Sequence, residues 1–223
     1  MKKNKISKDW LTKQKRDPFF KKSKIQGYRS RSAFKLIEMN KKFKFINKNS
    51  LVVDLGSSPG GWTQIASQKV TTGKILAVDI KPMENINKVD FIKGDFCDEN
   101  INKKIINYFS NKTDVVMSDI ATNTTGNKEL DAYRTGELCL NAMSLSLKIL
   151  KKDGVFLSKL FMGSIFKEIN KKAENCFKRV VKYKPLSSKK QSKEIYIFCK
   201  GVLKIWYIVQ SGRQEKNEKK YIY

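Results

Sequence analysis

Four aspartates occupy positions at which an α/β protein commonly presents acidic side chains to a ligand: Asp54, Asp79, Asp95 and Asp119. Each lies at or just after the end of a short apolar run that is typical of a buried strand. The carboxyl ends of parallel strands meet at one edge of the sheet, and ligands bind along that edge. A single aspartate of this kind is more often a turn residue, but four in register favour a binding site.

Two of these aspartates have spacings that indicate a nucleoside ligand. Asp79 follows Gly60 by 19 residues, about the separation at which a doubly wound fold places the acid that meets ribose hydroxyls. A carboxylate suits this task because it can accept hydrogen bonds from both hydroxyls at once. Asp95 is followed by Phe96, so its carboxylate is placed to accept from an adenine amino group while apolar atoms cover the ring.

Lys159 is the candidate proton acceptor. It ends the apolar run 155–158, where an ammonium group is costly to bury unless carboxylates lie nearby. Candidate partners are Asp119 on a neighbouring strand and Glu194 at the start of the last strand, while Lys35 can approach from an earlier helix. The chain has no histidine, so a general base must come from another residue type. Burial lowers the pKa of a lysine and adjacent carboxylates raise it, and the sequence leaves that balance open.

The stretch Leu51 to Trp62, LVVDLGSSPGGW, is the element that must position these groups. An apolar β-branched run is followed by a glycine-rich turn and then by residues of good helix composition, which is the first unit of a nucleotide-binding sheet. The spacing of Gly56 and the pair Gly60-Gly61 is not the GxGxxG of dinucleotide enzymes. This difference disfavours a dehydrogenase and leaves room for S-adenosylmethionine, which has no pyrophosphate.

Strands and helices are expected to alternate along the rest of the chain. Helices are predicted over residues 30–43, 63–70, 101–109, 129–150 and 163–177, and strands over 51–55, 74–79, 89–93, 114–118, 155–159, 179–183 and 194–200. This order predicts an α/β fold with a seven-stranded, mostly parallel sheet and helices on both faces. Because no helix separates the last two strands, they are expected to form a hairpin that contains one antiparallel strand.

Charge is distributed very unevenly along the 223 residues, whose net charge is +26. Residues 1–49 carry 17 basic and three acidic side chains, residues 50–150 carry 11 and 12, and residues 151–223 carry 19 and six. A lysine-rich proteome would explain the choice of lysine over arginine, but it does not explain why the middle of the chain is neutral. The basic ends therefore favour a polyanionic partner, with nucleic acid the best candidate.

Length and composition predict one enzyme domain with two extensions. We expect a basic arm over residues 1–26, the α/β domain over 27–200, and an extension of unknown role over 201–223. The four cysteines are scattered without a CxxC pair, so we expect reduced thiols and no metal site. No apolar run is long enough to span a membrane and no secretory signal is recognisable, so a cytoplasmic protein is expected.

The chain resembles the FtsJ/RrmJ family of ribosomal RNA large-subunit 2′-O-methyltransferases. The similarity runs in the family's order over about residues 8–200 and is far more specific than a glycine loop. The segments that carry it are GYRSRSAFKL (27–36), VVDLGSSPGGWTQ (52–64), AVDIKPM (77–83), VDFIKGDF (89–96), VVMSDIATN (115–123), LCLNAMSLSLKILKKDGVFLSKLF (138–161) and SSKKQSKEIYIF (187–198).

This resemblance implies a Rossmann-like S-adenosylmethionine-dependent methyltransferase fold and the residues of the site. The family's Lys-Asp-Lys-Glu tetrad falls on Lys35, Asp119, Lys159 and Glu194, with Lys159 as proton acceptor. The family's S-adenosylmethionine contacts fall on Gly60, Trp62, Asp79, Asp95 and Asp119. The expected reaction is methylation of a ribose 2′-hydroxyl, with a uridine as the target, in ribosomal RNA within the large subunit, carried out by a monomer.

Three alternatives remain open from the sequence. Enzymes that methylate transfer RNA or capped messenger RNA share the tetrad, although the compact size and the GYRSRSAFKL segment look more like the ribosomal type. A non-catalytic RNA-binding assembly factor could keep the fold, but the intact tetrad counts against it. A small-molecule methyltransferase is disfavoured by the basic ends.

Overall fold

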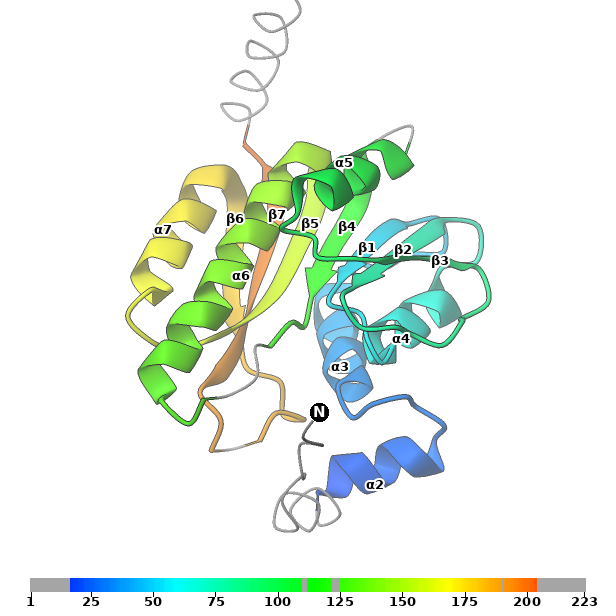
Figure 1. Ribbon diagram of the computed structural model, residues 1–223, viewed down its shortest axis with the longest axis horizontal. Helices are drawn as coiled ribbons and strands as arrows, with labels where there is room; N and C mark the ends of the chain where they lie inside the picture. Colours follow the sequence, from blue (N-terminus) through cyan, green and yellow to red (C-terminus); the bar gives the residue numbers. More distant parts are fainter. Residues whose placement is uncertain (1–16, 110–111, 122–124, 190, 204–223) are drawn as a thin grey trace, which may run out of the picture.

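The computed structural model describes residues 17–109, 112–121, 125–189 and 191–203, which form a seven-stranded sheet with helices on both faces. The strand order is β3-β2-β1-β4-β5-β7-β6, and Figure 1 shows the helices packed around this sheet. The strands are β1 (Leu51–Leu55), β2 (Lys74–Asp79), β3 (Val89–Lys93), β4 (Thr113–Ser118), β5 (Leu150–Phe161), β6 (Phe177–Tyr183) and β7 (Glu194–Val202).

The register of the parallel strands brings their carboxyl ends to one edge. Leu55 of β1 pairs with Val78 of β2 on one side and with Ser118 of β4 on the other. Ser118 in turn pairs with Ser158 of β5. The residues that follow these positions therefore emerge together, as the sequence predicted. β7 runs antiparallel to both β5 and β6, so the predicted hairpin and the predicted α/β fold class are confirmed.

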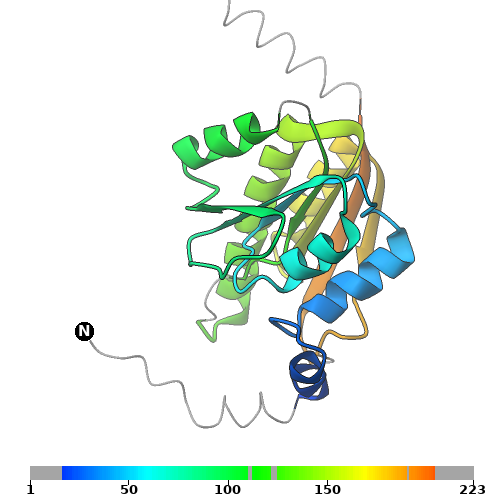
Figure 2. The same ribbon diagram turned by 90° about the vertical axis from the view of Figure 1, so that its right-hand side faces the viewer.

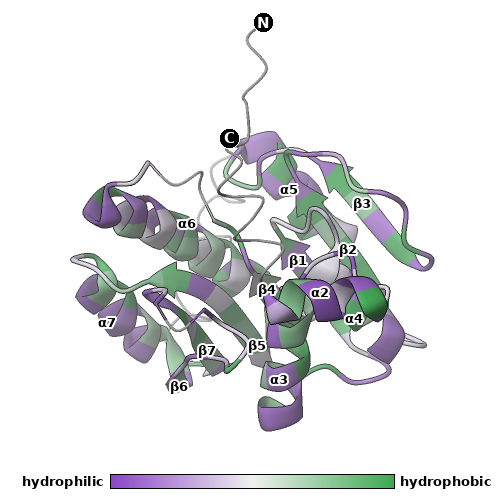
Figure 3. Cartoon of the chain, turned by 90° about the horizontal axis from the view of Figure 1, so that it is seen from below, coloured by the Kyte–Doolittle hydropathy of each residue, from purple (hydrophilic) through white to green (hydrophobic). Residues whose placement is uncertain are grey.

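In the described part of the chain, six helices cover the sheet or one of its ends: α2 (Pro18–Ile25), α3 (Ala33–Phe43), α4 (Gly61–Lys69), α5 (Glu99–Tyr108), α6 (Lys128–Ile149) and α7 (Phe166–Cys176). Turning the molecule by 90° shows α3 and α4 on one side of the sheet and α5 and α6 on the other (Figure 2). Along α6 and α7, hydrophobic and hydrophilic residues alternate (Figure 3), as expected of helices with one buried face.

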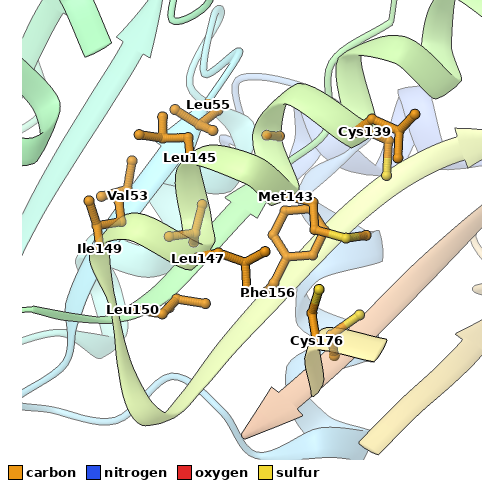
Figure 4. Packing of buried hydrophobic residues seen from close by; sticks show 14 of the residues in the cluster. Val53, Leu55, Cys139, Met143, Leu145, Leu147, Ile149, Leu150, Phe156 and Cys176 are labelled. Carbon is orange, nitrogen blue, oxygen red and sulfur yellow. The ribbon is translucent and has the colours of Figure 1, made fainter. Parts of the chain in front are cut away.

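Each face of the sheet has its own hydrophobic core. On one face, Val53 and Phe156 of the sheet pack against Met143 and Leu145 of α6, and all four are at most 1% exposed (Figure 4). On the other face, the cluster includes Leu36 of α3, Ile65 of α4 and Val52 of β1. The apolar run of each central strand is therefore buried on both sides, which explains why these strands show little alternation in sequence.

Most observed element boundaries lie within two residues of the predicted ones, and the largest differences are at the starts of α3, β5 and α7. β5 begins at Leu150 rather than at residue 155, because Leu150 pairs with Thr113 before the register shifts between Thr113 and Val115. α7 begins at Phe166 rather than at residue 163, after a turn that contains Gly163.

The basic arm contains a helix that the sequence did not reveal. The Asp17 carboxylate accepts hydrogen bonds from the Phe19 and Phe20 amides and caps α2. The Phe19 ring contacts the Phe34 ring of α3 at 5.5 Å between centroids, which attaches this helix to the core. Residues 1–16 of the arm and the tail 204–223 lie outside the described residues. None of the described helices is long and apolar enough to cross a membrane.

Candidate active site

Two lysines and two carboxylates meet at the carboxyl edge of the sheet. The Lys159 ammonium at the end of β5 lies 3.0 Å from Asp119 Oδ1 and donates a hydrogen bond of 2.6 Å to the Asp119 backbone oxygen. Lys35 of α3 pairs with Glu194 Oε1 of β7 at 2.6 Å. Lys35 and Lys159 are 7% exposed and Glu194 is 9% exposed. The structure thus brings together all four residues of the predicted tetrad in two buried ion pairs.

The pairing within this tetrad differs in one respect from the sequence prediction, which placed both carboxylates beside Lys159. Glu194 pairs with Lys35 instead, and the strand register explains this arrangement. In the ladder between β5 and β7, Lys159 stands opposite Tyr196, whereas Glu194 stands opposite Phe161. Directly opposite residues are the closest cross-strand neighbours, so Tyr196 occupies the place beside Lys159.

Tyr196 is a component of the site that sequence reasoning missed. Its side chain is fully buried, and its hydroxyl donates a hydrogen bond of 2.7 Å to Asp119 Oδ1. Its ring lies 5.6 Å below the Lys35 ammonium and contacts the Trp62 ring at 5.7 Å between centroids. The available signal was its position two residues after Glu194, since alternate residues of a strand share one face.

The electrostatic environment keeps Asp119 ionised. Burial by itself raises the pKa of this carboxyl, but the ammonium groups of Lys159 and Lys35 and the Tyr196 hydroxyl outweigh burial and hold the pKa below its ordinary value. The opposite applies to Tyr196, because burial and the nearby carboxylates of Asp119 and Glu194 raise its pKa well above 10. At neutral pH, the site therefore combines a charged carboxylate with a neutral phenol that donates to it.

The loop between β6 and β7 is fixed to α3 by Glu38, another residue that the sequence did not single out. The Glu38 carboxylate accepts hydrogen bonds from the Leu186 amide at 2.8 Å and the Tyr183 hydroxyl at 2.6 Å. Further along the same loop, the Ser188 hydroxyl donates to Glu194 Oε1 at 2.8 Å. Through these contacts, α3 orients the loop that holds one carboxylate of the tetrad.

A cavity of about 420 Å³ adjoins the tetrad along the ends of β1, β2 and β4. Its polar wall contains Asp79, Asp95 and Asp119, and its apolar wall contains Phe96 and Ile120. The Asp79 carboxylate accepts from the Ser58 and Lys81 amides, and the Asp95 carboxylate accepts from the Cys97 amide. These backbone contacts orient both carboxylates and leave further lone pairs for a ligand.

A second, smaller cavity of about 150 Å³ shares Asp119 with the first and is lined by Asp54, Ser57 and Trp62. The Ser57 hydroxyl is buried and finds no hydrogen-bond partner among the described residues. Burial raises the pKa of Asp54 from 3.8 to about 7, although the Thr63 hydroxyl, which donates at 2.6 Å, opposes this shift. The cavity therefore offers two carboxyls and a free hydroxyl to a small charged group.

Gly60 connects this cavity to the start of α4. It adopts a left-handed conformation with φ of 104°, and a side chain there would approach Arg29 and Met83 at about 3 Å. Only glycine tolerates this combination without strain. The two cavities together fit the groups of S-adenosylmethionine: carboxylates for the ribose, apolar walls for the adenine and a polar end for the amino acid portion.

Comparison with known proteins gives one consistent family. The sequence profile of the FtsJ-like methyltransferase family matches residues 28–202. Ribosomal RNA large subunit methyltransferase E of Pelagibacter ubique is 50% identical over 200 residues, which cover 90% of this chain and 98% of the relative. The protein of the same name from Rickettsia akari is 43% identical over 197 residues, covering 86% of this chain and 87% of the relative.

A solved structure supports the same fold. The crystal structure of a Plasmodium falciparum protein assigned as a ribosomal RNA methyltransferase superimposes with a TM-score of 0.71 at 31% identity. The match covers 79% of this chain and 99% of that chain.

Proposed function

The chain belongs to the FtsJ-like methyltransferase family and is an S-adenosylmethionine-dependent RNA 2′-O-methyltransferase, and we propose that it methylates the ribose of a uridine in large-subunit ribosomal RNA. The observation that carries this proposal is the buried contact between the Lys159 ammonium and Asp119 Oδ1 at 3.0 Å, beside the large cavity. The relatives named above support the large-subunit RNA as substrate.

Lys159 is the proposed proton acceptor for the 2′-hydroxyl. The sulfonium of bound S-adenosylmethionine supplies an already activated methyl group, so the protein has to align the hydroxyl and remove its proton. In this role, the Lys159 ammonium first releases a proton to solvent, and its amine then accepts the proton of the 2′-hydroxyl at Nζ. Asp119 then stabilises the resulting ammonium through the contact described above, and Tyr196 keeps the carboxylate in place.

Lys35 is proposed to steady the ribose or the adjacent phosphate. Its ammonium is held by Glu194, and Glu194 is held by Ser188. Only RNA offers a 2′-hydroxyl at this position, which gives the site its discrimination against DNA.

The residues proposed to hold the cofactor line the two cavities or the turn between them. Asp79 would accept from the ribose hydroxyls and Asp95 from the adenine amino group. Asp119, Gly60 and Trp62 would form the end that receives the amino acid portion, where the Ser57 hydroxyl has no hydrogen-bond partner among the described residues. A polar group that is buried without a partner is costly, which supports a ligand at this position.

The proposed partner is RNA within the assembled large subunit, with the enzyme acting as a monomer in the cytoplasm where the subunits are. The basic ends support an RNA partner, because lysines that neutralise phosphates release bound counterions. The affinity for RNA should therefore fall steeply as salt concentration rises.

A substrate panel tests the proposal. The protein is incubated with labelled S-adenosylmethionine and, separately, with large subunits, naked large-subunit RNA, transfer RNA or capped RNA, and the modified nucleotide is then mapped. The proposal predicts one 2′-O-methylated uridine in large subunits. Label in transfer RNA or capped RNA alone would assign a different substrate, and binding to subunits without any label would indicate a non-catalytic assembly factor.

A further inference from the structure

A third cavity, of about 400 Å³, lies at the opposite end of the sheet from the candidate active site. It opens where β1, β4 and β5 begin and where the antiparallel β7 ends, next to the residues that follow α3. In Figure 1 this is the end of the sheet away from α2. None of the predicted site residues lines this cavity.

Lysines from three separate parts of the chain line this cavity. They are Lys44 after α3, Lys151 and Lys152 in β5, and Lys200 in β7. Of the four, Lys151 forms a described ion pair, with Asp114 Oδ1 at 2.7 Å.

The carboxylates of the cavity are occupied within the fold. The second oxygen of Asp114 accepts from the Leu51 amide at 2.8 Å. Asp153, the other carboxylate of the lining, faces Lys178 at 3.9 Å. Within the part of the chain that the structure describes, no carboxylate pairs with Lys44, Lys152 or Lys200. The four lysines outnumber the two carboxylates of the lining, so the cavity carries a net positive charge.

The backbone at Lys44 adds a second observation. Lys44 ends α3 in a left-handed conformation with φ of 50° and ψ of 52°. Glycine and asparagine are the residues that usually occupy this position at the end of a helix. A lysine in this conformation carries a conformational cost, and such outliers concentrate at binding and catalytic sites.

We propose that this cavity binds phosphate groups of the RNA substrate, at a site remote from the methylated nucleotide. Lysine ammonium groups bind phosphate as point charges, and the side chains of Asn47 and Asn49 in the lining offer further donors. The proposal rests on the proposed function in one respect, namely that the bound RNA is the substrate.

The geometry separates this site from catalysis. Lys152 lies near the start of β5 and Lys159 near its end, so the two lysines are at opposite ends of the sheet. The two ends of the sheet also differ in charge, since the cavity at the active site presents Asp79, Asp95 and Asp119. The lysines at the far end therefore offer a separate, positively charged surface to phosphate groups.

The test compares two triple variants of the full chain. The first replaces Lys44, Lys152 and Lys200 by glutamine (Lys44→Gln, Lys152→Gln, Lys200→Gln). The control carries the same change at Lys104, Lys148 and Lys171, exposed lysines of α5, α6 and α7 that line none of the three cavities. Affinity for large-subunit RNA is measured over a range of KCl concentrations, and single-turnover methyl transfer is measured at saturating RNA.

In a plot of log affinity for RNA against log KCl concentration, the slope of the first variant should be shallower than that of the wild type by about two units, because each phosphate contact contributes about 0.7 to 0.9 to this slope. The control should keep the wild-type slope, and both variants should keep the wild-type single-turnover rate. Equal slopes in both triple variants would overturn the proposal. If the slopes of the wild type and the first variant differ as expected but the wild type transfers no methyl group, the proposed RNA site is supported and the proposed function is contradicted.

A second arm distinguishes RNA from free phosphate. The thermal unfolding midpoint is measured with and without inorganic pyrophosphate for the wild type and the first variant. Stabilisation of the wild type alone, together with equal RNA slopes, would assign the cavity to a free phosphate compound and overturn the assignment to RNA.

Discussion

Replacing Asp54 by asparagine should change how the stability of the protein depends on pH. Asp54 is 1% exposed, and burial raises its pKa from 3.8 to about 7, helped by the carboxylates of Asp119 and Asp79. Between these two pH values, the folded protein holds a proton that the unfolded chain has already released. The contribution of Asp54 to stability is therefore largest below pH 4 and falls as the pH rises to about 7.

The size of this change in stability follows from the shift in the pKa of Asp54. A difference of about three pKa units corresponds to about 4 kcal/mol, at about 1.4 kcal/mol per unit. An asparagine side chain cannot ionise, so the stability of the Asp54→Asn variant does not contain the part that the wild type loses when Asp54 ionises. The free energy of unfolding of the wild type relative to the variant should therefore fall by about 4 kcal/mol between pH 4 and pH 8.

Urea denaturation followed by tryptophan fluorescence measures this difference at a series of pH values. Contributions of groups that do not interact with Asp54 cancel when the two proteins are compared at the same pH. The same change at the exposed Asp153 is the control, and its difference from the wild type should stay within about 0.5 kcal/mol throughout. A wild-type-minus-variant difference for Asp54 that stays flat from pH 4 to pH 8 would refute the reasoning.

Three further substitutions test the contacts around the site. Tyr196→Phe removes the hydrogen bond to Asp119 and should lower the free energy of unfolding in urea by about 1.5 to 3 kcal/mol. The control Tyr133→Phe, at a half-exposed position, should lower it by less than about 0.5 kcal/mol. Equal losses in the two variants would exclude the contact. Asp79→Asn should weaken equilibrium binding of S-adenosylmethionine by about tenfold to a hundredfold while RNA affinity stays unchanged, and unchanged cofactor affinity would contradict the assignment. Glu38→Ala releases the loop between β6 and β7 and should lower the methylation rate about tenfold or more at saturating cofactor. The rate of Glu38→Gln should be intermediate. A wild-type rate in Glu38→Ala would show that the loop does not need the Glu38 contacts.

Sequence reasoning reached the fold and the composition of the tetrad because both depend on local patterns. Apolar runs ending in Asp54, Asp79 or Asp119 predict strand ends, and parallel strands must share an edge. The register of β1, β2 and β4 confirms this alignment. The hairpin of β6 and β7 was also predictable from a local pattern, because no helix separates the two strands.

The contacts that sequence reasoning missed join residues far apart in the chain. Glu38 and Leu186 are separated by 148 positions, and Tyr196 and Asp119 by 77. Such pairs depend on how α3 and β7 approach the rest of the fold, which no local pattern specifies. The pairing of Glu194 with Lys35 instead of Lys159 has the same origin, because the β5–β7 register decides which side chain stands opposite Lys159.

Helix α2 was missed for a different reason. Its sequence is short and rich in lysine, and an isolated helix of eight residues is too short to be stable by itself. The Asp17 cap and the contact of Phe19 with Phe34 supply its stability. The capping aspartate followed by proline was the signal that could have revealed it.

The measurement that tests the central claim most directly is methyl transfer by the Lys159→Ala variant, made at saturating RNA and cofactor alongside equilibrium binding of S-adenosylmethionine. If Lys159 accepts the proton of the 2′-hydroxyl, the rate should fall by about a hundredfold to ten-thousandfold while cofactor affinity stays near that of the wild type. A variant that binds the cofactor normally and methylates at the wild-type rate would contradict the account.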